Sequence, residues 1–291
     1  MRIACWSWGG KRHVGTISSC GREATPLAVP DAESGALGLI QALVDGHDLP
    51  STSSARLPVD VITLHAPLFR PLRSLWCVGR NYRAHAAELA ASVFRGTDAQ
   101  EDSWPMVFSK QAECVVGPHD LVRMPGAAIS TQIDYESELA VVIGRGGRDI
   151  SRARAMEHLF GYTIVNDVTA RDIQMRHKQW DLGKNLDTFC PMGPWIVTAD
   201  ELDGRDTRVR GWVNGELRQD ASTADMIFDI PTLIETCSRG ITLYPGDVIA
   251  TGTPAGVGMG LSPQRWLAHG DVVRVEIDGI GAIENRFERS A

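Results

Sequence analysis

The chain has 291 residues, 43% of them hydrophobic and 22% charged, with a formal net charge of −7 at pH 7. This composition is typical of a soluble globular protein and excludes a disordered or collagen-like chain, and no apolar run approaches the ~18 residues of a membrane span. The 29 basic residues form no long block, so no nucleic-acid surface is expected. Six scattered cysteines and the lack of a secretory apolar block predict a cytoplasmic protein with reduced thiols.

Residues 1 to about 70 are predicted to form a small N-terminal appendage. The pair Gly9-Gly10 separates Arg2–Ile3 from His13–Ser18 and indicates a hairpin, and a helix is expected near Leu37–Val44. No cluster of reactive side chains occurs in this stretch. A structural role is therefore predicted for it.

Residues 71–291 are predicted to form one larger, sheet-rich α+β unit. Short apolar runs punctuated by glycine and proline are typical of strands, and the few short helices between them argue against alternating βαβ units. Asn214-Gly215 is a hairpin signal. The expected strands are Leu75–Val78, Met106–Phe108, Leu139–Ile143, Gly161–Val165, Trp195–Val197, Val209–Val213, Val248–Ala250 and Val272–Ile277.

A strand, a turn and a helix are predicted in that order over Cys77–Leu89. On the helix, His85 and Glu88 are i, i+3 neighbours, so Glu88 can orient the imidazole and raise its basicity. His85 would then be a general base that activates water. Because His/Glu pairs on helix surfaces are common, the pair alone leaves a plain surface role open.

Two glutamates enter an apolar strand within Asp134–Gly144. Strand side chains alternate, so Glu136 and Glu138 share a face about 7 Å apart at Cα, and something positive must compensate them. The next apolar strand ends at Asp167, and three carboxylates together would suit a hard cation such as Mg²⁺ or Mn²⁺. The residues alone leave the alternative open that Glu136 begins an exposed edge strand and Asp167 caps a helix.

The segment after Asp167 has helical spacing. Arg171, Gln174 and Lys178 stand at i, i+3 and i+7 and therefore share one face beside the predicted metal site. Arg171 and Gln174 could hold a substrate carboxylate or keto oxygen, since a guanidinium fork matches a carboxylate. A solvated helix face is the alternative.

A glycine-rich segment, Thr251–Gly260, follows a predicted strand. It has some features of a dinucleotide-binding fingerprint, but Pro263 and the Gly270-Asp271 turn leave no room for a crossover helix. A loop that lines a pocket and offers the Thr253 hydroxyl and backbone amides to an anion fits better. A plain tight connection is the alternative.

Taken in order, these motifs resemble the fumarylacetoacetate hydrolase family over residues 74 to 291. The resemblance is to the short, two-part members, including the fumarylacetoacetate hydrolase domain-containing proteins, rather than to the longer tyrosine-pathway enzyme. The matching stretches are VGRNYRAHAAEL (78–89), FSK (108–110), DYESELAVVIG (134–144), GYTIVNDVTARDIQ (161–174), KNLDTFCPMGPWIVT (184–198), VNGELRQ (213–219), PGDVIATGTPAGVG (245–258) and GDVVRVEIDGIG (270–281).

The resemblance implies a mixed β-roll with a small N-terminal appendage, a homodimer, and a bound Mg²⁺ or Mn²⁺. It favours the metal interpretation of the three carboxylates and places the His/Glu pair on the family's mobile lid. For the tail of the substrate, only Ser109 and Lys110 are suggested. The implied site residues are His85, Glu88 and Lys184 for catalysis, Arg171, Gln174 and Thr253 for the substrate, and Glu136, Glu138 and Asp167 for the metal.

The main functional hypothesis is a metal-dependent hydrolase that cleaves the C–C bond of a 2,4-dioxo acid such as an acylpyruvate. In it, His85 activates water and Lys184 stabilises the enolate that leaves. The alternative on the same site is a tautomerase or decarboxylase of oxaloacetate, or an isomerase of a 2-hydroxydienedioate. A non-catalytic binding protein is a third hypothesis, disfavoured because the charged groups of the mechanism are present. A small anionic 2-oxo acid is the expected partner in the enzymatic hypotheses.

Overall fold

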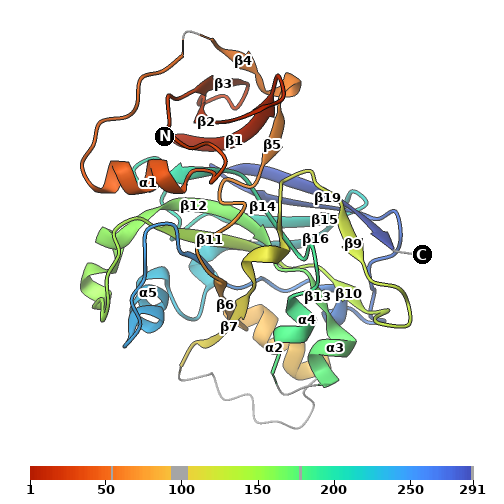
Figure 1. Cartoon of the computed structure of the whole chain (residues 1–291). Coiled ribbons are helices and arrows are strands. Elements are labelled where there is room, and N and C mark those ends of the chain that lie inside the picture. The colour runs from red at the N-terminus through yellow and green to blue at the C-terminus, as the bar shows by residue number, and fades with distance from the viewer. Residues whose placement is uncertain (54, 93–103, 177–178, 290–291) are drawn as a thin grey trace.

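The computed structural model describes residues 1–53, 55–92, 104–176 and 179–289. Strands dominate these residues and form three sheets, with five short α-helices at their edges (Figure 1). The helices are α1 (Leu37–Val44), α2 (Arg83–Ser92), α3 (Arg171–Arg176), α4 (Asp181–Lys184) and α5 (Ile230–Ser238). None of the helices in the described part of the chain is long and apolar enough to cross a membrane.

The largest sheet runs from the N-terminal strands to the strands beside α2. Its order is β4 (Leu57–Pro58), β3 (Glu23–Pro26), β2 (Lys11–Ile17), β1 (Arg2–Trp8), β14 (Cys190–Thr198), β12 (Leu159–Asn166), β11 (Ser137–Ile143), β17 (Val248–Ala250), β6 (Leu75–Gly79) and β7 (Met106–Lys110). In addition, β5 (Thr63–His65) pairs with β1, and β8 (Val115–Val116) pairs with β14.

Two smaller sheets complete the fold. The five-stranded sheet has the order β16 (Glu216–Ser222), β15 (Arg208–Val213), β18 (Val272–Ile277), β19 (Gly281–Arg289) and β9 (Val122–Met124), and β10 (Ile133–Asp134) pairs with β13 (Thr169–Ala170). Asn214 and Gly215, with φ of 51° and 80°, form the predicted two-residue turn between β15 and β16.

The expected sheet-rich α+β fold is confirmed, and each of the eight predicted strands lies within an observed strand. The predicted N-terminal hairpin and helix are β1–β2 and α1. Strand β1 also pairs with β14, with Arg2 opposite Val197, so the N-terminal segment extends the large sheet. The domain boundary near residue 70 stays a prediction. All six cysteines are free.

The centre of the large sheet is buried on both faces, and this is what positions the site. Every residue of β11 and β14 is buried, because their apolar side chains pack into a core on each side of the sheet. Helices α2, α3 and α4 gather at one end of the molecule beside β6 and β7, at the opposite end from the N-terminal strands (Figure 1). Polar side chains at the ends of these central strands are therefore held by a buried, closely packed part of the sheet.

Candidate active site

Three carboxylates meet where β11 begins and β12 ends. The antiparallel register pairs Ser137 with Asn166, and the Asp167 backbone N–H donates to the Glu136 carbonyl at 2.9 Å. One oxygen each of Glu136, Glu138 and Asp167 lies within 4.8 Å of the others, and all three residues are buried. We call these residues the acidic triad. Its assembly follows from the sheet register, which joins segments about thirty residues apart.

Buried cations surround the triad, as the repulsion between its carboxylates requires. Lys184 Nζ lies 2.7 Å from Glu136 Oε2 and 2.8 Å from Asp167 Oδ2, and Arg171 Nη2 lies 2.7 Å from Glu136 Oε1. Lys110 Nζ lies 2.9 Å from Asp167 Oδ1. Burial acts to raise the pKa of Glu136, but the charges of Lys184 and Arg171 overcome it and lower that pKa to about 2.

Glu138 differs from the other two members of the triad. Its Oε2 accepts a hydrogen bond from the Gly252 backbone N–H at 2.9 Å, and it forms no ion pair within the described residues. Burial and the neighbouring charges of Asp167 and Glu136 raise its pKa well above the usual value. An added cation would relieve this repulsion, and three convergent carboxylates are the oxygen ligands that Mg²⁺ and Mn²⁺ prefer. The triad therefore fits a divalent ion.

Asp134 holds Arg171 in place, a role that sequence patterns did not identify. Its Oδ2 accepts from Arg171 Nε at 2.8 Å, and its two carboxylate oxygens also accept from the backbone N–H groups of Gly258 and Met259 at 2.7 and 3.0 Å. Asp134 is fully buried at the end of β10. The guanidinium of Arg171 is therefore fixed between Asp134 and Glu136. The only signal in the sequence was the position of Asp134 at the head of the acidic stretch.

The predicted substrate-binding residues lie on separate elements of the same site. Gln174, on α3, accepts from Arg171 Nη1 at 3.1 Å through Oε1, which leaves its amide N–H₂ for a ligand oxygen. The Thr253 hydroxyl donates to the Ser137 carbonyl at 3.1 Å and accepts from Gln219 at 2.8 Å, so its proton already has an acceptor in the protein. Lys178 lies outside the described residues.

His85 and Glu88 lie on α2, as predicted, and are in contact. His85 Nδ1 lies 3.0 Å from Glu88 Oε2, and the His85 side chain is 3% exposed. Glu88 Oε1 accepts from the Gly256 backbone N–H at 3.0 Å, which ties α2 to the glycine-rich loop. When the neutral imidazole donates from Nδ1 to Glu88, Nε2 is the basic nitrogen.

The expectation that the glycine-rich loop offers amides to a substrate anion is wrong for four of them. The N–H groups of Gly252, Gly256, Gly258 and Met259 bind carboxylates of the protein itself, those of Glu138, Glu88 and Asp134. The exclusion of a dinucleotide fold agrees with the structure, because a single 3-10 turn at Gly258–Gly260 stands where a crossover helix would be needed. The glycine-rich loop therefore connects α2, through Glu88, to Asp134 in the site.

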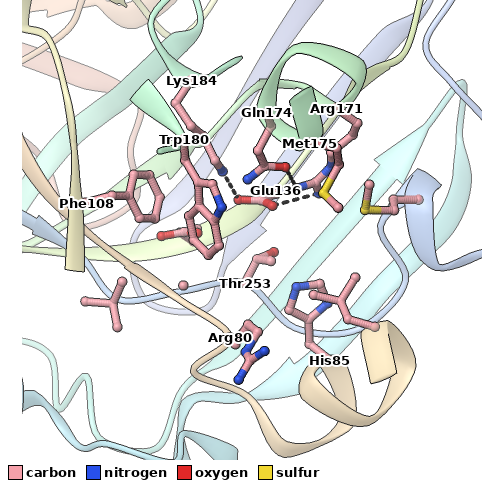
Figure 2. Close-up of a pocket in the computed structure, with 15 residues that line it drawn as sticks. Arg80, His85, Phe108, Glu136, Arg171, Gln174, Met175, Trp180, Lys184 and Thr253 are labelled. Carbon is pink, nitrogen blue, oxygen red and sulfur yellow. Dashed lines mark hydrogen bonds and ion pairs between the residues drawn. The ribbon is translucent and has the colours of Figure 1, made fainter. Parts of the chain in front are cut away.

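Two members of the triad, Glu136 and Glu138, line one pocket together with Arg171, Lys184 and His85 (Figure 2). Ser109 and Lys110, suggested for the substrate's tail, are not among the described residues that line it, and Lys110 instead forms an ion pair with Asp167. Phe108, Trp180 and Arg80 were not predicted there. The lining residues are Val78, Gly79, Arg80, His85, Leu89, Phe108, Glu136, Glu138, Arg171, Gln174, Met175, Trp180, Lys184, Thr253 and Met259.

Aromatic side chains close one side of this pocket. The rings of Phe108 and Trp180 meet edge to face, with centroids 5.3 Å apart, and Lys184 Nζ lies 4.9 Å from the Phe108 centroid. An aromatic face beside an ammonium stabilises the positive charge and excludes water. Phe108 therefore packs beside the Lys184 ammonium, which contacts Glu136 and Asp167 of the acidic triad.

Known proteins resemble both the sequence and the structure. Oxaloacetate tautomerase YisK of Bacillus subtilis (strain 168) is 50% identical over 227 residues, which are 78% of this chain and 73% of the relative. Mitochondrial oxaloacetate tautomerase FAHD2A of Homo sapiens is 44% identical over 233 residues, 79% of this chain and 71% of the relative.

Solved structures agree over the whole chain. A fumarylacetoacetate hydrolase (EaFAH) from psychrophilic Exiguobacterium antarcticum matches with a TM-score of 0.87 at 40% identity and covers 100% of both chains. A 2-hydroxyhepta-2,4-diene-1,7-dioate isomerase from Mycobacterium marinum matches with a TM-score of 0.80 at 33% identity, over 100% of this chain and 99% of that chain. The family model described as fumarylacetoacetate (FAA) hydrolase C-terminal matches residues 74–288. The chain therefore belongs to the fumarylacetoacetate hydrolase family.

Proposed function

We propose that the chain is a divalent-metal-dependent tautomerase that interconverts the enol and keto forms of oxaloacetate. The observation that supports this most strongly is the juxtaposition, in one pocket, of two fixed cations with a buried histidine that contacts a glutamate. Arg171 and Lys184 stand on one side, and His85 stands on the other with its free nitrogen available for a proton. Two relatives with 50% and 44% identity carry the name oxaloacetate tautomerase, which supports oxaloacetate as the substrate of this chain.

The residues of the chain have separate tasks in this reaction. A Mg²⁺ or Mn²⁺ ion held by Glu136, Glu138 and Asp167 would supply Lewis acidity toward the carboxylate and the neighbouring oxygen of the substrate. Arg171 and the Gln174 amide orient the carboxylate. Lys184 places positive charge where the substrate oxygen becomes negative.

The proton moves at the carbon next to the keto carbon. In the direction from enol to keto, the enol hydroxyl loses its proton and C3 gains one, so the overall composition does not change. His85 Nε2 is the proposed group that carries a proton to or from C3, and Glu88 keeps the imidazole in the tautomer that allows this. The Thr253 hydroxyl donates its proton to the Ser137 carbonyl, so the Thr253 side chain contributes its oxygen to the pocket wall.

The hydrolase hypothesis uses the same residues, with His85 activating water instead of moving a substrate proton. The relatives favour the tautomerase alternative, and one structural neighbour carries an isomerase title. Tautomerisation and isomerisation share proton transfer next to a carbonyl and need no water in the pocket. We also propose that the chain acts as a homodimer, as the family resemblance implies.

A substrate panel tests the proposal. Purified protein with Mg²⁺ or Mn²⁺ is incubated with enol-oxaloacetate, an acylpyruvate and a 2-hydroxydienedioate, and the ultraviolet absorbance of each enol is followed against a protein-free control. We expect the fastest decay above background with enol-oxaloacetate, with oxaloacetate intact as the product. Faster cleavage of the acylpyruvate, detected as released pyruvate, would support hydrolysis and contradict the proposal.

A further inference from the structure

Two adjacent buried residues bind the glycine-rich loop from the end of β10. Asp134 is the last residue of that strand, and Tyr135 follows it. The Asp134 carboxylate accepts from the N–H groups of Gly258 and Met259. The Tyr135 hydroxyl donates to the Gly256 carbonyl at 2.7 Å. Asp134 and Tyr135 therefore hold the loop at successive points along residues 256–259.

Gly256 carries this hold on to the proton-transfer side of the pocket. Its N–H donates to Glu88 Oε1 at 3.0 Å, and Glu88 Oε2 lies 3.0 Å from His85 Nδ1. Gly256 has φ of 105°, and a Cβ there would overlap the Arg218 carbonyl oxygen, so the backbone at this point has little freedom to move. An unbroken series of contacts thus joins the Tyr135 hydroxyl to the His85 imidazole.

The Asp134 carboxylate also reaches the anion-binding side. Its Oδ1 accepts from the N–H groups of Gly258 and Tyr135 at 2.7 and 3.0 Å, and its Oδ2 accepts from the Met259 N–H at 3.0 Å and from Arg171 Nε at 2.8 Å. All four partners are donors, so a neutral amide in its place could serve only part of them, because an NH₂ group cannot accept. Both oxygens of the carboxylate are therefore needed.

Packing links the same loop to α2. Leu89, the residue after Glu88, forms a small apolar cluster with Val257 and Met259 of the loop. A shift of the loop would therefore move both a donor to Glu88 and the apolar surface against which α2 packs. The position of the loop thus bears on the placement of His85.

We propose that Asp134 and Tyr135 are positioning residues that couple the two sides of the pocket. Through the glycine-rich loop they place Glu88 and His85 for proton transfer, and Asp134 also orients Arg171 for the substrate anion. This coupling rests on the proposed function for the roles of His85 and Arg171. Neither Asp134 nor Tyr135 is among the described residues that line the pocket, so both act through other side chains.

Two conservative substitutions separate the two effects, measured with added Mg²⁺. Tyr135→Phe removes one hydroxyl, and we expect kcat to fall about 10-fold with the affinity for the unreactive anion malate unchanged. Asp134→Asn should lower kcat similarly and weaken malate binding about 10-fold, the loss of a charge-assisted contact to Arg171. Removal of a negative charge alone would strengthen anion binding, so weaker binding identifies the loss of orientation. Tyr244→Phe, at an exposed tyrosine outside the described pocket lining, is the matched control.

A double-mutant cycle tests the route from the loop to His85. Glu88→Ala removes the acceptor of the Gly256 N–H, so Tyr135→Phe should lower kcat by less than about 2-fold in that background. An equal loss in both backgrounds would show that Tyr135 acts through general stability, and would overturn the proposal. Malate binding by Asp134→Asn that is unchanged or tighter would overturn the hold of Asp134 on Arg171.

The coupling and the proposed function can fail separately. The cycle uses whichever enol of the substrate panel the wild type converts, so a hydrolase result contradicts the tautomerase proposal and still tests the coupling. If the wild type converts none, the ¹⁵N resonances of the His85 imidazole, assigned by their loss in His85→Asn, replace kcat. They should shift in Tyr135→Phe and not in Tyr244→Phe, and unshifted resonances in Tyr135→Phe would overturn the coupling. An active tautomerase whose Tyr135→Phe and Asp134→Asn variants match the wild type would contradict the coupling alone.

Discussion

The two sides of the pocket are built in opposite ways. The acidic triad lies at the ends of β11 and β12, two central strands of the large sheet, where register, burial and four ion pairs to three cations fix its geometry. Helix α2, which carries His85, is held by the hydrogen bond from Gly256 to Glu88 and by the small apolar cluster of Leu89 with Val257 and Met259. Ion pairs therefore fix the first side of the pocket, whereas a hydrogen bond and apolar packing hold the second.

Removing one of the proposed metal-binding carboxylates of the acidic triad should have the largest effect. In Glu138→Gln we expect metal affinity to fall by more than about 100-fold, since the loss of even an outer partner of a metal ligand costs roughly 10- to 100-fold. Tautomerase activity should fall with it. Calorimetric titration with Mn²⁺ measures the affinity, and Glu284→Gln, an exposed carboxylate on β19, is the control. Unchanged affinity in Glu138→Gln would remove this residue from the metal site.

Changing His85, the proposed base on α2, should separate metal binding from proton transfer. His85→Asn is expected to lower kcat by about 10²- to 10⁴-fold, the usual contribution of a general base, while metal affinity stays at the wild-type value. Exposed His119→Asn is the matched control. Full activity in His85→Asn would rule out its proton-transfer role, and a loss of metal binding would show that the two sides are not independent.

Disturbing the contact between the glycine-rich loop and α2 should have a smaller effect. A Cβ at Gly260 would lie 2.0 Å from Glu88 Cδ, so Gly260→Ala must push the Glu88 side chain away from Gly256 and from His85. We expect kcat to fall about 10-fold through misplacement of the base, with metal binding unchanged. Gly126→Ala, where an added Cβ meets nothing within 4 Å, is the control. If Gly260→Ala matches the wild type, Glu88 does not position His85 through this contact.

The strands of the acidic triad could be predicted from the sequence, whereas the contacts between distant segments could not. Local alternation and apolar runs were sufficient to predict β11 and β12, and the acidic residues at their ends stood out because carboxylates are costly there. Family motifs then supplied the roles of His85 and Lys184. Features that depend on partners chosen by the fold were not predictable, since sequence spacing does not say which amide or cation will be nearest.

Two residues illustrate that limit. Asp134 and Arg171 meet only because β10 pairs with β13, which places Ile133 opposite Ala170. Lys110 ends a strand that pairs with β6, yet its ammonium reaches Asp167 at the end of β12. Amides of the glycine-rich loop were expected to meet a ligand and instead bind Glu138, Asp134 and Glu88, because these carboxylates also need donors.

The central claim is that the acidic triad holds a divalent ion on which tautomerisation depends. The most direct test measures the decay of enol-oxaloacetate absorbance with chelator-treated protein and then during titration with Mn²⁺ or Mg²⁺. We predict a background rate after chelation, a saturable recovery on adding the ion, and no recovery in Glu138→Gln over the same range. A full rate in the chelated enzyme, or a Glu138→Gln response identical to that of the wild type, would contradict the claim.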